Sequence, residues 1–167
     1  MTITRMALSL VLGTTACGSS AARESGQVEG SNQSRDCAGD LRTAAAIDTS
    51  KLGRREVDGP PDKSAEGSTI VEFRDALQPK LLVVTYFGET GRTWYAYYFA
   101  SPTSYLLRIH EERYAAPLTA ESPVVADSSS RELVVCNGAL RQPSDSSAYK
   151  AGKEILVQAD SLLRSKR

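Results

Sequence analysis

Ten of the eleven aromatic residues in this chain lie between Ser68 and Tyr114, a stretch that also holds its longest apolar runs. Residues 68–74 alternate between apolar and polar side chains, which is the period-two pattern of a strand with one buried face. Residues 80–87 and 93–100 are rich in β-branched and aromatic side chains, and residues 105–114 alternate again. Short segments with glycine, proline or aspartate separate these runs. The stretch therefore predicts four consecutive antiparallel strands.

Two further segments complete the predicted fold. Residues 132–139 read as a fifth strand, and small or aliphatic residues recur every three or four positions from residue 148 to 163, as in an amphipathic helix. Gly152 costs about 1 kcal/mol relative to alanine inside a helix, so we expect the helix to approach the sheet closely there. A short helix is also predicted from Asp40, as its N-cap, to a stop at Gly53.

The predicted fold class is therefore α+β. It is an antiparallel β-meander of four or five strands packed by the C-terminal helix, with the short N-terminal helix in addition. Residues 54–67 contain Gly59-Pro60-Pro61 and many charges, so they are predicted to be a surface connector. Residues 115–131 contain two prolines and a run of serines, and they are predicted to be a long loop.

The first sixteen residues have the layout of a secretory signal, with an apolar stretch at Met6–Leu12 followed by small residues. The apolar stretch is too short to span a bilayer as a helix. With Cys17 directly after Ala16, this segment resembles the leader of a bacterial lipoprotein, in which the cysteine after the cleavage site carries the lipid. Thr14 stands where such leaders usually have leucine, so the main alternative is ordinary secretion with cleavage after Ala16 or Ala22. A start that is not cleaved, on a cytosolic chain, is the least favoured alternative.

The resemblance implies residues 1–16 as a signal peptide and a lipid anchor on Cys17 in the bacterial cell envelope. Residues 17–36 are mostly glycine, serine and polar residues, which predicts a disordered tether. Residues 37–167 then form a single globular domain. If Cys17 carries lipid, Cys37 and Cys136 remain as a disulfide pair in an oxidising compartment. The alternative is two unrelated buried thiols.

A second pattern lies inside the aromatic stretch. The run of residues 86–92, the aromatic residues 97–99, and then Tyr114 and Pro117 together look like a pattern found in small exported bacterial proteins. The resemblance carries over no catalytic residue. It supports the meander and implies nothing about activity.

Several classes of function have no support in the sequence. The 20 basic and 20 acidic residues balance without a long run of either sign, so nucleic acid is not an expected partner. His110 is the only histidine, and its alternation with Arg108 and Glu112 predicts an exposed strand face rather than a catalytic pocket. No zinc-binding spacing and no phosphate loop is present. We therefore expect no metal and no cofactor, and an enzyme acting through carboxylates or tyrosines is the least favoured reading.

The aromatic residues are the one feature that suggests a function. On the predicted strand 93–100, Trp94 and Tyr98 share a face with the small Ala96 between them. If the polar residues of the neighbouring strands lie on that face, the result is a slot of flat rings edged by charge. The candidate binding surface comprises Trp94, Tyr98, Glu72, Arg74, Arg108 and His110.

Such a surface suits stacking of sugar rings or anchoring of a protein partner. We therefore predict a non-enzymatic binding or accessory module of the envelope, with an envelope protein or a glycan as its partner. The alternative is a purely structural envelope component, in which the tyrosines only make cross-strand pairs.

Overall fold

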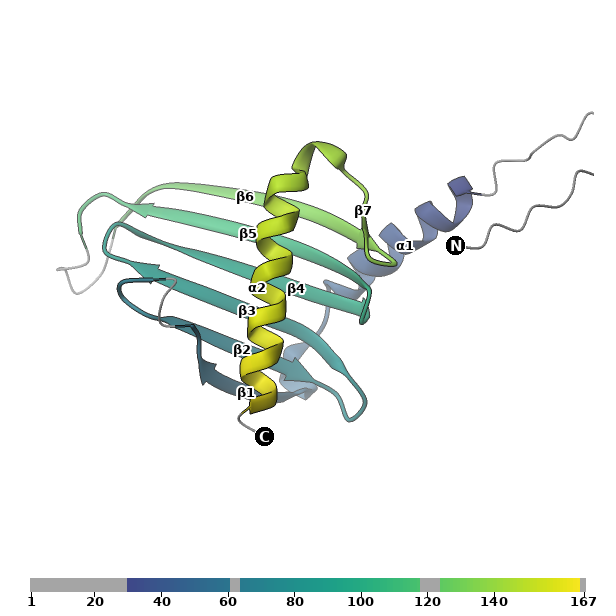
Figure 1. Cartoon of the computed structure of the whole chain (residues 1–167), viewed down its shortest axis with the longest axis horizontal. Coiled ribbons are helices and arrows are strands. Elements are labelled where there is room, and N and C mark those ends of the chain that lie inside the picture. Colours follow the sequence, from purple (N-terminus) through teal and green to yellow (C-terminus); the bar gives the residue numbers. More distant parts are fainter. Residues whose placement is uncertain (1–29, 61–63, 118–123, 166–167) are drawn as a thin grey trace, which may run out of the picture.

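The computed structural model describes residues 30–60, 64–117 and 124–165, which form one antiparallel sheet and two helices (Figure 1). The seven strands follow each other across the sheet in sequence order, and each pairs antiparallel with the next. The strands are β1 (Gly53–Asp58), β2 (Ser68–Arg74), β3 (Pro79–Gly88), β4 (Gly91–Ser101), β5 (Ser104–Tyr114), β6 (Val125–Cys136) and β7 (Ala139–Leu140). The helices are α1 (Gly30–Ala44) and α2 (Ser146–Ser165), with short 3-10 turns η1 (Thr49–Lys51) and η2 (Pro143–Asp145). The predicted α+β class and meander are confirmed, but four or five strands is an undercount.

The missed strand segments lie at the two edges of the sheet. β1 lies in the segment that was predicted to be a connector. Its sequence is rich in charge and lacks the pattern of a strand, because only Val57 packs against the core. β6 begins at Val125, inside the predicted loop, and its residues 125–132 are all exposed. These residues lack any apolar alternation, and they form a strand by pairing with β5. Edge strands bury less than central ones, so their sequences carry a weaker hydrophobic signal.

α2 crosses in front of the sheet in Figure 1 and covers the face that carries the main core. The Tyr97 hydroxyl donates a hydrogen bond to the Gly152 carbonyl oxygen at 2.6 Å. A Cβ atom on Gly152 would lie 2.5 Å from Cδ2 of Leu107, so glycine permits the close approach expected from the sequence. Burial raises the pKa of the Tyr97 hydroxyl far above its ordinary value, which keeps it protonated as a donor. The main core contains Ile70, Leu82, Val84, Tyr97, Tyr105, Leu107, Ile109, Leu133, Val135, Ala159 and Leu163.

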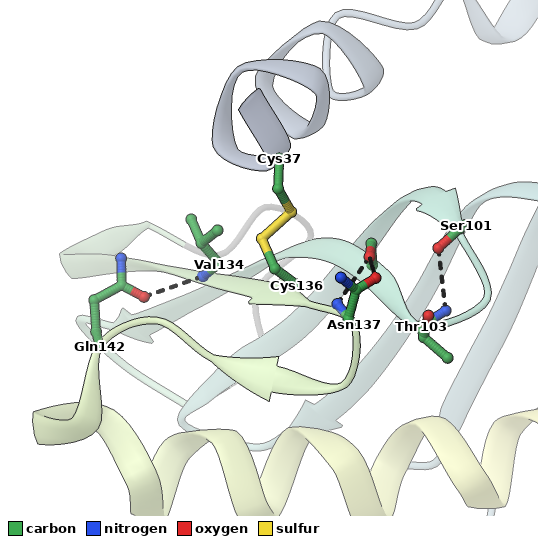
Figure 2. The surroundings of a disulfide bond; sticks show 8 residues. Cys37, Ser101, Thr103, Val134, Cys136, Asn137 and Gln142 are labelled. Atoms are coloured by element: carbon green, nitrogen blue, oxygen red, sulfur yellow. Dashed lines mark hydrogen bonds between the residues drawn. A yellow bond between two sulfur atoms is a disulfide. The ribbon is translucent and has the colours of Figure 1, made fainter. Parts of the chain in front are cut away.

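α1 packs on the opposite face of the sheet, at one end of β4, β5 and β6. Its Leu41 is fully buried against Leu106 and Val134. Cys37 of α1 forms a disulfide with Cys136 at the end of β6, as predicted, and the bond joins residues 99 positions apart (Figure 2). This bond and the small apolar cluster around it hold α1 on the sheet.

The boundaries of the N-terminal helix differ from the prediction. α1 begins at Gly30, so Asp40 lies inside the helix rather than at its N-cap, and Gly53 begins β1 instead of ending a helix. Residues 30–36, predicted as part of the tether, belong to α1. The predicted signal peptide, Cys17 and the rest of the tether lie outside the described residues. In the described part of the chain, no helix is both long and apolar enough to cross a membrane.

Candidate functional site

The pairing register decides which side chains share the face opposite α2. Directly opposed residues of antiparallel strands point to the same side of the sheet. Trp94 lies opposite His110, and Ala96 lies opposite Arg108. These four residues are out of phase with Tyr97, which contacts α2. The structure therefore brings Trp94, Arg108 and His110 together on the face away from α2, as the sequence predicts.

A cavity of about 220 Å³ opens on this face, beside the part of the sheet that α1 covers. Ala96 is only 5% exposed and lies between the half-buried rings of Trp94 and Tyr98. Tyr98 also packs against the cluster beneath α1, which fixes one end of the cavity. We call this cavity the Trp94 slot. It is lined by Trp94, Ala96, Tyr98, Arg108, Ile109, His110, Ser130, Arg131 and Glu132.

Two side chains hold the Trp94 ring. The His110 ring lies against it, with the ring centroids 4.0 Å apart and the planes tilted by 32°. The Arg92 guanidinium carbon lies 5.0 Å from the centroid of the Trp94 ring, within the range of a cation–π interaction. Glu112 binds Arg92 through a 2.7 Å hydrogen bond, which lowers the pKa of its own carboxyl group. The tryptophan side chain is therefore oriented before any ligand binds.

Arg108 holds the other ring of the slot in a similar way. Its guanidinium carbon lies 5.2 Å from the Tyr98 centroid, and its Nε donates to Glu132 at 3.0 Å. The hydrogen bond to Glu132 raises the pKa of Arg108, so this side chain stays charged. Because Glu132 is paired with Arg108, the rim offers both hydrogen-bond donors and acceptors.

A polar side chain lies near each ring nitrogen of His110. Nδ1 lies 2.5 Å from the Ser130 hydroxyl, and Nε2 lies 3.6 Å from Oε1 of Glu112. Serine, histidine and a carboxylate are the residue types of a hydrolytic triad. Here the carboxylate is too far from the ring for a hydrogen bond, and its other oxygen binds Arg92. The arrangement orients the imidazole at the slot without the tight acid–base contact of a triad.

Two residues of the predicted surface lie elsewhere, which corrects the prediction. Glu72 lies opposite Leu82, which in turn lies opposite Tyr97, so Glu72 points to the α2 face and is only 3% exposed. Arg74 accompanies it, with Nη1 4.0 Å from Glu72 Oε2. The alternation of side chains shows which residues of one strand share a face. Which face of the neighbouring strand lies on the same side of the sheet depends on the pairing register. That register follows from the β2–β3 turn and was not readable from β2 alone.

Several residues that line or support the slot were missed by sequence reasoning. Ser130 and Glu132 come from the part of β6 that was predicted as a loop or as the start of the fifth strand. Arg92 and Glu112 support the slot from β4 and β5. Extending the alternation from Trp94 back by two residues would have placed Arg92 on the same face.

The described residues contain no cluster of three or more histidine, cysteine, aspartate or glutamate side chains that could hold a metal ion. The Trp94 slot is thus a small aromatic cavity with a polar rim that carries both arginine and glutamate side chains. Comparison with protein-family models, with curated proteins and with solved structures finds no match to this chain.

Proposed function

We propose that this chain is a non-enzymatic binding protein of the bacterial cell envelope, and that the Trp94 slot takes one ring of a saccharide. The observation that carries the proposal is the placement of Trp94 and Tyr98 on one open face, with the small Ala96 between them. The cavity of about 220 Å³ is smaller than the roughly 300–1,000 Å³ typical of sites for drug-sized ligands. This size suits a single ring rather than a large cofactor.

The chemistry of the slot favours a sugar over a purely apolar group. A sugar ring presents C–H groups on its flat faces and hydroxyl groups around its edge. The two aromatic rings match the faces, while Arg108 supplies donors and Glu132 supplies acceptors for the hydroxyl groups. The side chains are already held by their ion pairs and ring contacts, so little rotamer freedom is lost on binding.

The location in the envelope rests on the sequence. It is supported by the resemblance of residues 1–17 to a lipoprotein leader, and a disulfide between Cys37 and Cys136 suits an oxidising compartment. In this proposal a lipid on Cys17 holds the domain at a membrane, close to the glycans of the cell wall. The alternative is a structural envelope component in which the slot stays empty.

The first test uses the fluorescence of Trp94, which is the only tryptophan in the chain. Titration with soluble oligomers of N-acetylglucosamine should change its emission in a saturable manner. Arg108→Ala should weaken binding roughly 10- to 150-fold, because a hydrogen bond to a charged group is worth about 1.5–3 kcal/mol. Arg113→Ala is the matched control. It removes another arginine of β5, but one on the opposite face, so its binding should equal that of the wild type.

Two results would contradict this proposal. An emission spectrum that stays constant up to high saccharide concentration would rule out a saccharide as the ligand. In that case, a protein whose binding depends on Arg108 would be the ligand instead. Labelling of Ser130 by a fluorophosphonate would show instead that the contact between Ser130 and His110 activates a nucleophile.

The lipid anchor has its own test. Cells expressing the wild-type chain should incorporate labelled palmitate into it, and Cys17→Ser should abolish the label completely. Cys136→Ser is the control, because it removes a cysteine that the structure assigns to the disulfide and should leave the label in place. An unlabelled wild-type chain recovered at full length from the cytosol would rule out the anchor.

A further inference from the structure

β6 leaves a long open edge on the sheet. β7 pairs only with Val135 and Cys136 at the end of β6. Within the described residues, no strand pairs with the outer side of β6 before that point, and side chains 125–132 are all exposed. Because an open edge presents unpaired backbone donors and acceptors, it is a template for another strand.

Contacts at Val134 show which backbone groups point outward. Its N–H donates to Oε1 of Gln142, and its carbonyl oxygen accepts from the Arg141 N–H, both on the side away from β5 (Figure 2 shows the Gln142 bond). Backbone groups alternate in direction along an antiparallel strand. The N–H and C=O groups of Glu132, Ser130 and Ser128 therefore also point to the open edge.

We propose that two copies of this chain pair through their β6 edges, antiparallel, about a two-fold axis that passes through Ser129. Pairing requires that outward-pointing residues of one copy face outward-pointing residues of the other. This axis satisfies the requirement, because Ser128 then lies opposite Ser130 of the second copy. The same axis places Asp127 opposite Arg131 of the second copy, twice by symmetry.

The charges select this register over its neighbours. Shifting the axis by one residue in either direction still matches outward-pointing groups, but it places Asp127 opposite Ser129 or Leu133 and loses both ion pairs. Charged residues on an edge strand usually oppose pairing with other chains. Here the strand is complementary to itself in one register only. The serines between the two charges are small and allow the backbones to approach.

Asp127 and Arg131 are available for such pairs. Among the salt bridges of the described residues, neither takes part in one. Arg113 on β5 lies opposite Asp127, and Glu111 on β5 lies two residues along from Ile109, the residue opposite Arg131. An irregularity in the β5–β6 register beyond Asp127 limits regular pairing to residues 127–131 and their neighbours. The interface is therefore short, and we expect a reversible dimer.

A charge swap tests the register. Sedimentation velocity of the purified full chain, over a series of concentrations, should show a monomer–dimer equilibrium. Asp127→Arg should raise the dimer dissociation constant about 10- to 100-fold, because two attractive pairs become two repulsive ones. Arg131→Asp should do the same. An equal mixture of the two variants should dimerise at least as well as the wild type, because only the mixed dimer pairs opposite charges. Glu89→Arg, at the exposed β3–β4 turn, is the control for net charge.

A backbone variant tests the edge itself. Ser128→Pro removes an outward-pointing N–H group while leaving the β5–β6 hydrogen bonds in place. We expect a monomer with an unchanged circular dichroism spectrum. The proposal is overturned if the wild type is monomeric at every concentration, if Asp127→Arg dimerises like the wild type, or if a dimer survives Ser128→Pro.

Discussion

Replacing both Cys37 and Cys136 with alanine is expected to lower the free energy of unfolding by about 3–5 kcal/mol. The bond closes a loop between residues 99 positions apart, and the chain-entropy model assigns about 4.7 kcal/mol to a loop of about 100 residues. The loss also has a local part, because the bond holds α1 on a small apolar cluster around Leu41. Denaturation by urea, followed by circular dichroism under non-reducing conditions, measures the change.

Cys17→Ala is the matched control, because the disulfide joins the other two cysteines of the chain. Its unfolding curve should coincide with that of the wild type. A double alanine variant within about 1 kcal/mol of the wild type would mean that the disulfide contributes little to the stability of the folded state.

Leu107→Ala should cost about 2–5 kcal/mol, because it truncates a fully buried side chain at the contact between β5 and α2. Gly152→Ala alone should also destabilise the fold. The added methyl group gains about 1 kcal/mol of helix propensity, but it lies 2.5 Å from Leu107 Cδ2 and should cost about 1–3 kcal/mol through overpacking.

The double variant shows whether this contact sets the position of α2. When Leu107→Ala empties the space, the methyl group of Gly152→Ala can enter it, so the double variant should lose about 1 kcal/mol less than the sum of the single losses. Ser161→Ala, at an exposed position of the same helix, should combine additively with Leu107→Ala. Additive behaviour of the Gly152 pair as well would contradict the close approach.

The parts of the fold that were predictable are those with strong local periodicity. β4 and α2 each bury one face, so their sequences repeat with the period of a strand or a helix. β1 and the first half of β6 bury little, and their conformation is set by the neighbouring strand. The start of α1 was missed because its first residues are polar and carry no apolar stripe.

In the candidate site, too, the features within one strand were predictable from the sequence and those that depend on two strands were not. Trp94 and Tyr98 share a face through alternation within one strand, which a sequence shows directly. The places of Glu72 and Ser130 depend on the registers between strands. A register is set by turn geometry and by packing of the whole sheet, so it cannot be obtained from either strand alone.

The sheet order has a consequence for how the chain folds. Since each strand pairs with its neighbour in sequence, the hairpins can form one after another as the polypeptide emerges, and such local topologies fold quickly. Cys37 is made early, whereas its partner belongs to the sixth strand. The bond between Cys37 and Cys136 can therefore form only after six strands have been synthesised. By then the other strands that α1 contacts, β4 and β5, are already made, so the covalent bond fixes α1 on a sheet that is largely assembled.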